Sequence, residues 1–144
     1  MFVDASAAIA ILAGEPDAKA LLKKIEASQT GVFYSPSVAF EAVQALVRLQ
    51  TPRTARIKNK EKELFDSVDQ LVVGFFEELE AVELPIDSEV GALARKAARD
   101  FGKGRGHPAQ LNFGDCLAYG CAKAKKLPLL FKGNDFVHTD IQAA

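Results

Sequence analysis

The sequence has few of the residues that build disulfide frameworks or soft metal sites. Its 144 residues include only two cysteines, Cys116 and Cys121, and only two histidines. The cysteines are five positions apart in an apolar segment, a spacing that does not align them on one helical face, so we expect no disulfide. A zinc site would need more thiolate or imidazole ligands. We interpret both cysteines as small core residues, which is consistent with a reducing, cytoplasmic setting.

Long apolar runs and an excess of positive charge are also missing. No apolar run approaches the ~20 residues that span a bilayer, and the N-terminal "MFVDAS" lacks the basic start of a signal peptide. We therefore expect a soluble, cytoplasmic protein without membrane contact. The net charge of −1 shows no global basic field for nucleic acid, although a local basic patch can still steer a polyanion. The length and ordinary composition suit one domain, residues 1–144.

Strand-like and helix-like patterns alternate along the chain. The predicted strands are short apolar runs at 1–4, 31–35, 81–86 and 128–131, with "TDI" at 139–141 as a short fifth. The predicted helices cover 6–11, 17–28, a segment from 36, a segment ending near 80, 87–101 and 113–125. Ser6 is a candidate cap for the first helix. The alternation predicts an α/β fold with a central parallel sheet of four to five strands flanked by helices.

Four acidic residues are candidates for a shared site. Asp4 and Asp135 follow the first and the last main predicted strands, and ligands of open parallel sheets bind beyond the carboxyl ends of strands. Glu41 lies within the apolar helical stretch "SVAFEAVQAL", where a charge is costly unless it is paired or reaches a cleft. Asp115 lies near the start of a helix, where an acid also stabilises the helix N-terminus.

Such carboxylates would repel one another at one sheet edge unless a cation were bound. Mg²⁺ and Mn²⁺ prefer oxygen ligands and retain water for chemistry. The pattern therefore favours metal-dependent phosphoryl chemistry by in-line displacement. Two alternatives stay open: another metal-dependent α/β phosphohydrolase, and a catalytically silent binding partner. The D-A-S of the first strand lacks the D-x-D of haloacid-dehalogenase phosphatases.

Two segments resemble a known family. The opening "MFVDASAAIAIL" resembles the start of PIN domains. The segment "HPAQLNFGDCLAYGCAKAKKLPLLFKGNDFVHTDI" closely resembles the C-terminal signature of VapC toxins, the ribonuclease half of VapBC toxin–antitoxin modules. The resemblance spans the whole chain, is strongest over 102–141 and is weakest between 50 and 80. It implies a PIN fold, an Mg²⁺- or Mn²⁺-dependent endoribonuclease, and inhibition by a cognate VapB-like antitoxin.

The resemblance also implies residue roles. The acidic set would be Asp4, Glu41, Asp115 and Asp135. Within it, the metal ligands would be Asp4, Asp115 and Asp135, and Glu41 would orient or deprotonate the attacking water. Asn134 stands where some relatives carry another acid, and its amide can bind water or a substrate oxygen. Ser6 is either a donor that holds the Asp4 carboxylate or a helix cap.

Several basic and polar residues are assigned lesser roles. The candidate contacts to RNA phosphates are Lys103, Arg105 and Lys132, with Arg53 and Arg56 as weaker ones. His107 precedes a proline and lacks nearby soft ligands, so we do not expect it to bind metal. We interpret His138 as a structural hydrogen-bonding residue and Asn112 as a helix cap.

The implied partners are RNA and protein. The RNA is expected to be a looped or single-stranded region of transfer, ribosomal or messenger RNA, and promoter DNA is expected only indirectly through the antitoxin. Candidate apolar faces for the antitoxin lie on the helices at 17–28 and 54–80, with most of these side chains in the core or in a homodimer contact: Phe65, Val68, Leu71, Val72, Phe75 and Phe76. A basic antitoxin side chain would compete with the metal in the acidic pocket.

Overall fold

The computed structural model describes residues 1–51 and 58–144, with side chains described except at 52–60. Arg53 and Arg56 lie outside the described residues. The strands are β1 (Phe2–Val3), β2 (Phe33–Tyr34), β3 (Val82–Glu83) and β4 (Leu129–Leu130). The helices are α1 (Ala5–Leu12), α2 (Ala18–Glu26), α3 (Pro36–Gln50), α4 (Lys58–Glu78), α5 (Ser88–Phe101) and α6 (Phe113–Ala124).

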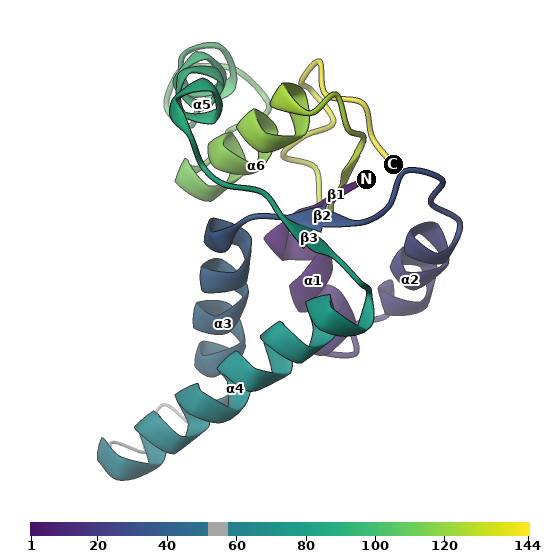
Figure 1. Cartoon of the computed structure of the whole chain (residues 1–144). Helices are drawn as coiled ribbons and strands as arrows, with labels where there is room; N and C mark the ends of the chain where they lie inside the picture. Colours follow the sequence, from purple (N-terminus) through teal and green to yellow (C-terminus); the bar gives the residue numbers. More distant parts are fainter. Residues whose placement is uncertain (52–57) are drawn as a thin grey trace.

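The sheet is parallel throughout, with strand order β3-β2-β1-β4. Its helices form two layers, with α5 and α6 on one side of the sheet and α1 to α4 on the other (Figure 1). Parallel neighbours need crossover segments, which these helices provide. Because Val3 pairs with Leu130, the chain leaves β1 and β4 at the same edge. The predicted α/β fold with a central parallel sheet is confirmed.

The predicted fifth strand at 139–141 is wrong. The C-terminal segment instead makes one isolated parallel bridge, between Leu129 and Ala143. Residues 139–141 are diverted from the sheet because the Thr139 hydroxyl donates to the Phe136 carbonyl, 2.8 Å away, and Tyr119 and Lys123 bind the Asp140 side chain. The sheet therefore has four strands among the described residues.

The core lies along β1 and β4 and beneath the helices. Phe2, Val3, Leu129 and Leu130 are all buried on both faces of the sheet, which explains why these strands are continuous apolar runs rather than alternating ones. On the α1–α4 side, Tyr34 stacks on Phe76 of α4 with ring centroids 3.9 Å apart. Both cysteines are buried and free, as predicted. No helix in the described part of the chain has the length and apolar character needed to cross a membrane.

The helix caps differ from the prediction in one place. Asp4, not Ser6, caps α1, because the Asp4 carboxylate accepts from the Ser6 N–H. Ser6 lies in the first helical turn instead. Asn112 caps α6 as predicted, and it forms a reciprocal capping box with Asp115. The glycine-rich loop between α5 and α6 turns with Gly104 and Gly106 at positive φ, where glycine is favoured.

Candidate active site

Asp4 is placed at the carboxyl end of β1 and is almost fully buried, with 3% of its surface exposed. Its N–H donates to the Leu130 carbonyl of β4 at 2.9 Å, so the two strand ends are tied together. Burial raises the pKa of the Asp4 carboxyl, the hydrogen bonds from Ser6 and the Ala5 N–H oppose that effect, and the charge of Asp135 adds to it. A buried carboxylate with an acidic neighbour is poised to bind a cation.

Ser6 connects Asp4 to the segment that follows β4. Its hydroxyl donates to the Asp4 Oδ2 atom at 2.5 Å and accepts from the Lys132 N–H at 3.0 Å. One side-chain oxygen thereby fixes the orientation of the carboxylate and the path of the chain towards Asp135. This contact matches the donor role that the sequence left as one of two options for Ser6.

Asp115 belongs to the first turn of α6 and is 8% exposed. Its Oδ2 atom accepts from the Asn112 N–H at 2.7 Å, while the Asp115 N–H donates to Asn112 Oδ1 at 3.0 Å. Burial raises the pKa of Asp115 to about 6; the Asn112 bond lowers it, and the charges of Asp4, Asp135 and Glu41 raise it further. The capping role and the site role are therefore both present in one residue.

Glu41 extends from α3 towards the start of α6. A Cβ atom placed on Gly114 would lie 2.1 Å from Glu41 Oε2, so only a residue without a side chain allows this approach. Burial and the charge of Asp4 raise the pKa of Glu41, and Arg48 lowers it. Glu41 thus reaches a cleft, which is the condition under which a charge in its apolar stretch is tolerated.

Asp135 and Asn134 lie on the exposed turn after β4. Gly133 has φ +98°, a conformation that glycine adopts without strain and that turns the chain away from the strand. The Asn134 carbonyl accepts from the Val137 N–H at 3.3 Å. Asp135 is the most solvated of the four acids, yet its charge acts on both Asp4 and Asp115.

The four predicted acids therefore converge from four segments at one sheet edge, each coupled electrostatically to at least one other. Within the described residues, no three acidic, histidine or cysteine side chains already form a metal-binding group. The donor set still suits a hard divalent cation, since it consists of carboxylate oxygens with an amide nearby and no thiolate or imidazole. A bound cation would have to draw these side chains closer.

The predicted phosphate contacts differ in their surroundings. Lys132 forms ion pairs with Glu15 and with Asp17, the latter at 3.2 Å, so its charge is already compensated. Lys103 and Arg105 are exposed on the glycine-rich loop and form no ion pair within the described ranges.

Neither histidine is placed as a metal ligand. His107 Nδ1 accepts from the Ala109 N–H at 3.2 Å, and its ring packs edge-on against Phe101, with centroids 5.1 Å apart. Local loop packing therefore occupies His107. His138 is exposed, and no hydrogen bond of its side chain occurs within the described part.

Sequence reasoning missed the aromatic side chains beside the acids. Phe113 is 82% exposed and Phe40 is 66% exposed, and both border a hollow that includes Glu41. A phenylalanine at the first position of an apolar helix gives no pattern signal that separates a core residue from a surface one. The position of Phe113 between Asn112 and Asp115 was the only available clue.

On the face of α4 proposed for the antitoxin, some apolar residues are buried in the core and others are exposed. Val68, Val72 and Phe76 are buried in the core, whereas Phe65 and Leu71 are 37% and 45% exposed. Phe75 is half-buried and packs against Phe76. Part of this helix therefore remains available for a partner.

A central parallel sheet with acids gathered at its carboxyl edge agrees with the resemblance to PIN domains, and the PIN domain family model matches residues 1–142. A VapC ribonuclease of Rhizobium meliloti is 44% identical over 97% of this chain and 98% of its own length. Ribonuclease VapC42 of Mycobacterium tuberculosis is 37% identical over 100% of this chain and 98% of its own. The chain belongs to the VapC family of PIN-domain ribonuclease toxins, and its activity class is that of an endoribonuclease.

The fold comparison agrees. The crystal structure of Mycobacterium tuberculosis VapC20, a sarcin–ricin loop cleaving toxin, superposes with a TM-score of 0.67 and covers 99% of this chain and 97% of its own. At 14% identity, this match supports the PIN fold alone. The alternative of a different class of α/β phosphohydrolase is set aside by the family match.

Proposed function

We propose that this chain hydrolyses RNA with the help of a divalent cation, Mg²⁺ or Mn²⁺, held by Asp4, Asp115 and Asp135. The observation that carries the proposal is the convergence of four acids at one sheet edge, two of which, Asp4 and Asp115, are buried. Burial, with the neighbouring acids adding to it, raises the pKa of Asp115. Such an arrangement is unfavourable without a cation and favourable with one. The structural role of Asp115 as a helix cap would not by itself require three acidic neighbours.

In this proposal each residue of the site has a distinct task. A bound cation would neutralise negative charge at the phosphate and lower the pKa of a bound water. Asp4 is held in one orientation by Ser6, and Asp115 by Asn112, so two ligands are fixed before the cation binds. Glu41, whose raised pKa favours proton uptake, orients the attacking water and accepts its proton. Asn134 offers an amide to water or to a substrate oxygen.

The partners follow from the family. We propose a VapB-like antitoxin that covers the exposed apolar part of α4 and places a basic side chain among the acids, in competition with the cation. A homodimer would bury other parts of the same apolar surface, and promoter DNA would be reached only through the antitoxin. The substrate would be a looped or single-stranded region of transfer, ribosomal or messenger RNA in the cytoplasm.

The test is RNA cleavage by purified, antitoxin-free protein with Mg²⁺, with Mn²⁺ and with a chelator. Asp4→Asn and Asp115→Asn are the variants, because an amide keeps the size of the carboxyl and one acceptor oxygen but removes the charge. Lys62→Gln, on the exposed face of α4, is the matched control. We expect metal-dependent cleavage by wild type and control that both Asp variants lose. Equal cleavage by all four proteins would refute the assigned site.

A further inference from the structure

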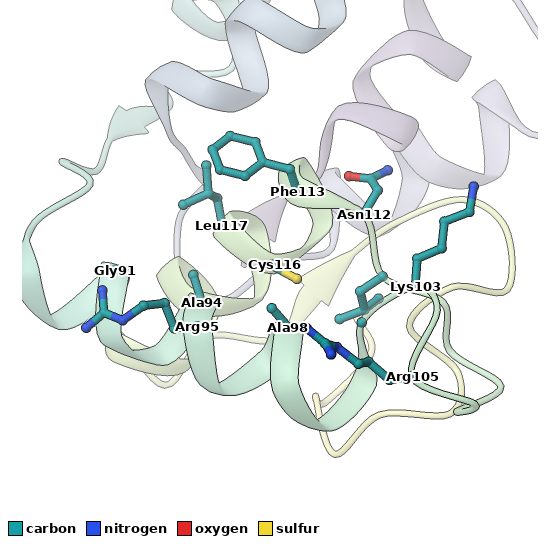
Figure 2. A pocket seen from close by; sticks show the side chains of 12 residues that line it. Gly91, Ala94, Arg95, Ala98, Lys103, Arg105, Asn112, Phe113, Cys116 and Leu117 are labelled. Carbon is teal, nitrogen blue, oxygen red and sulfur yellow. The ribbon is translucent and has the colours of Figure 1, made fainter.

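A groove of about 540 Å³ lies between α5 and α6 and is bordered by Asn112 and Phe113 at the start of α6 (Figure 2). It exists because α5 presents small residues on this face: Gly91, Ala94 and Ala98 are spaced three and four positions apart. Leu111, Cys116 and Leu117 line the opposite side. The volume lies in the range of sites for one small ligand, and the lining is mostly apolar.

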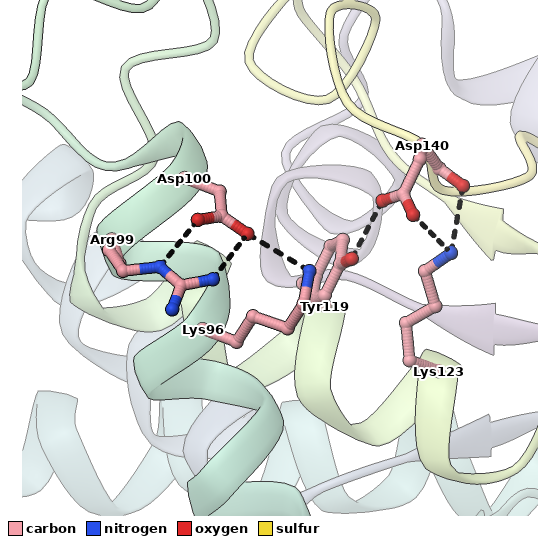
Figure 3. Close-up of polar contacts among 6 residues, drawn as sticks. All are labelled: Lys96, Arg99, Asp100, Tyr119, Lys123 and Asp140. Atoms are coloured by element: carbon pink, nitrogen blue, oxygen red, sulfur yellow. Dashed lines mark hydrogen bonds and ion pairs between the residues drawn. The ribbon is translucent and has the colours of Figure 1, made fainter.

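The rim of this groove is basic. Arg95 of α5 and Lys103 and Arg105 of the glycine-rich loop border it, and all three are exposed (Figure 2). In the described part of the chain none of them has an ion-pair partner. By contrast, two other basic residues of α5, Lys96 and Arg99, both form ion pairs with Asp100 (Figure 3). The three rim charges are thus available for an anionic ligand.

Phe113 lies at the edge of this groove. Its ring is 82% exposed, although an aromatic ring is more stable buried than in contact with water. Phe113 and Asn112 also border a second hollow, of about 380 Å³, which contains Glu41 and Arg48. The basic groove and the hollow beside Glu41 therefore share Asn112 and Phe113 in their walls.

We propose that this groove receives one unpaired base of the RNA substrate, stacked on Phe113, while Arg95, Lys103 and Arg105 bind the adjacent phosphates. Apolar walls beside an exposed aromatic ring suit the face of a nucleic-acid base. Three basic side chains without ion-pair partners suit the phosphates next to that base. An apolar protein segment would leave these charges without counterparts. The inference rests on the proposed ribonuclease function, which supplies RNA as the ligand, and assigns the position of one nucleotide.

The first test measures binding without cleavage. Fluorescence anisotropy of a short, labelled, single-stranded RNA is recorded in chelator for wild type, Phe113→Leu and Phe113→Tyr. Phe65→Leu, on α4, is the control for loss of an exposed phenylalanine. We expect about tenfold weaker binding for Phe113→Leu, because stacking of one base is lost. Phe113→Tyr and Phe65→Leu are expected to bind as wild type does. Equal binding by Phe113→Leu and wild type overturns the proposal.

A second RNA probe separates the base from the backbone. Each oligonucleotide of a series carries one abasic residue at a different position. At one position, loss of the base is expected to weaken binding by wild type but not by Phe113→Leu. Lys103→Gln and Arg105→Gln are expected to reduce the dependence of affinity on salt by about one phosphate contact each, whereas Lys62→Gln leaves it unchanged. Identical salt dependence in all these proteins would remove the basic rim from the RNA path.

The outcomes distinguish this inference from the proposed function. If Asp115→Asn loses cleavage while the groove variants bind and cleave as wild type, the base site is wrong and the ribonuclease assignment stands. If the groove variants lose binding while Asp115→Asn still cleaves, the base site stands and the metal site is wrong. If Phe113→Leu weakens binding of the cognate antitoxin but not binding of RNA, the groove is a site for the protein partner and the proposal fails.

Discussion

Gly114 and Glu41 come so close that a Cβ atom on residue 114 would lie 2.1 Å from the Glu41 Oε2 atom. This contact brings α3 against the first turn of α6, where free backbone N–H groups and the helix dipole favour a negative charge. The absence of one side chain therefore sets the position of the carboxylate proposed to handle the water. It also gives a way to move Glu41 without changing its chemistry.

Gly114→Ala is expected to displace the Glu41 carboxylate and to reduce cleavage at least tenfold, since misplacement of about 1 Å in a catalytic group is costly. Stability should change little, because the displaced atom is at the end of a flexible side chain and alanine favours helix by about 0.5–1 kcal/mol. Gly74→Ala is the control, with nothing within 4 Å of its new Cβ atom. Wild-type cleavage by Gly114→Ala would show that the position of Glu41 does not matter.

Ser6→Ala tests whether the bridge from Asp4 to Lys132 serves the site. Loss of a group that orients a metal ligand is expected to cost about 10–100-fold in metal affinity or activity. The measurement is cleavage as a function of Mn²⁺ concentration, in which the half-saturating concentration should rise. Ser28→Ala, whose hydroxyl bonds only within an exposed turn, serves as control. An unchanged metal dependence would reduce Ser6 to a helix residue.

The sheet could be predicted because β1 and β4 are short, continuous apolar runs, the pattern of parallel strands that are buried on both faces. It misplaced the cap of α1, since Asp4 and Ser6 are both good capping residues and only the tertiary pairing with Leu130 makes Asp4 the boundary. The strand at 139–141 failed because Tyr119 and Lys123, distant in sequence, bind Asp140. Local patterns carry no information on such long-range contacts.

The acids were found from strand ends and from charge in apolar stretches, which are local signals. The compensation of Lys132 by Glu15 and Asp17 was not predictable, because a loop before α2 had to fold back onto the segment after β4. The exposure of Phe113 likewise depends on how α5 and α6 pack. Sequence patterns do not predict the exposure of a single side chain between two helices, because that exposure depends on tertiary packing.

Gly120→Ala tests that packing. Its Cβ atom would lie 2.7 Å from the Val90 carbonyl oxygen and 3.2 Å from the Ala94 N atom, both on the backbone of α5. Backbone cannot move aside as a side chain does, so we expect a loss of about 1–3 kcal/mol in the free energy of unfolding. Urea denaturation of this variant beside Gly74→Ala measures the effect. Because α5 forms one wall of the groove, RNA binding should weaken as well.

Metal removal gives an independent test of the acids. A cation that binds only the folded protein stabilises it by mass action, so the melting temperature of wild type should rise with Mg²⁺ or Mn²⁺ and fall with chelator. Asp115→Asn should remove that response. The same variant should melt a few degrees higher than wild type in chelator, because mutual repulsion is relieved while an amide oxygen can still accept from the Asn112 N–H. A metal response that persists in the variant would place the cation elsewhere.

The Asp140 carboxylate predicts a pH effect away from the site. The Tyr119 hydroxyl donates to it at 2.7 Å and the Lys123 ammonium at 3.0 Å (Figure 3). The Tyr119 bond is the main cause that lowers the pKa of Asp140 below its ordinary 3.8, and Lys123 adds to it. A depressed carboxyl pKa contributes stability that is present above the unfolded value and is lost as pH falls through the folded one.

Tyr119→Phe isolates this contribution, since it removes the hydroxyl and keeps the buried ring. We expect the variant to be about 1 kcal/mol less stable than wild type near neutral pH. The difference should shrink as pH falls below about 3.8, where Asp140 takes up a proton. Urea unfolding of both proteins across this range measures it. Subtraction cancels the opposite slope from Asp115, whose raised pKa weakens the metal-free fold as pH rises towards 6. A difference independent of pH would mean that the hydroxyl acts through packing and not through the Asp140 charge.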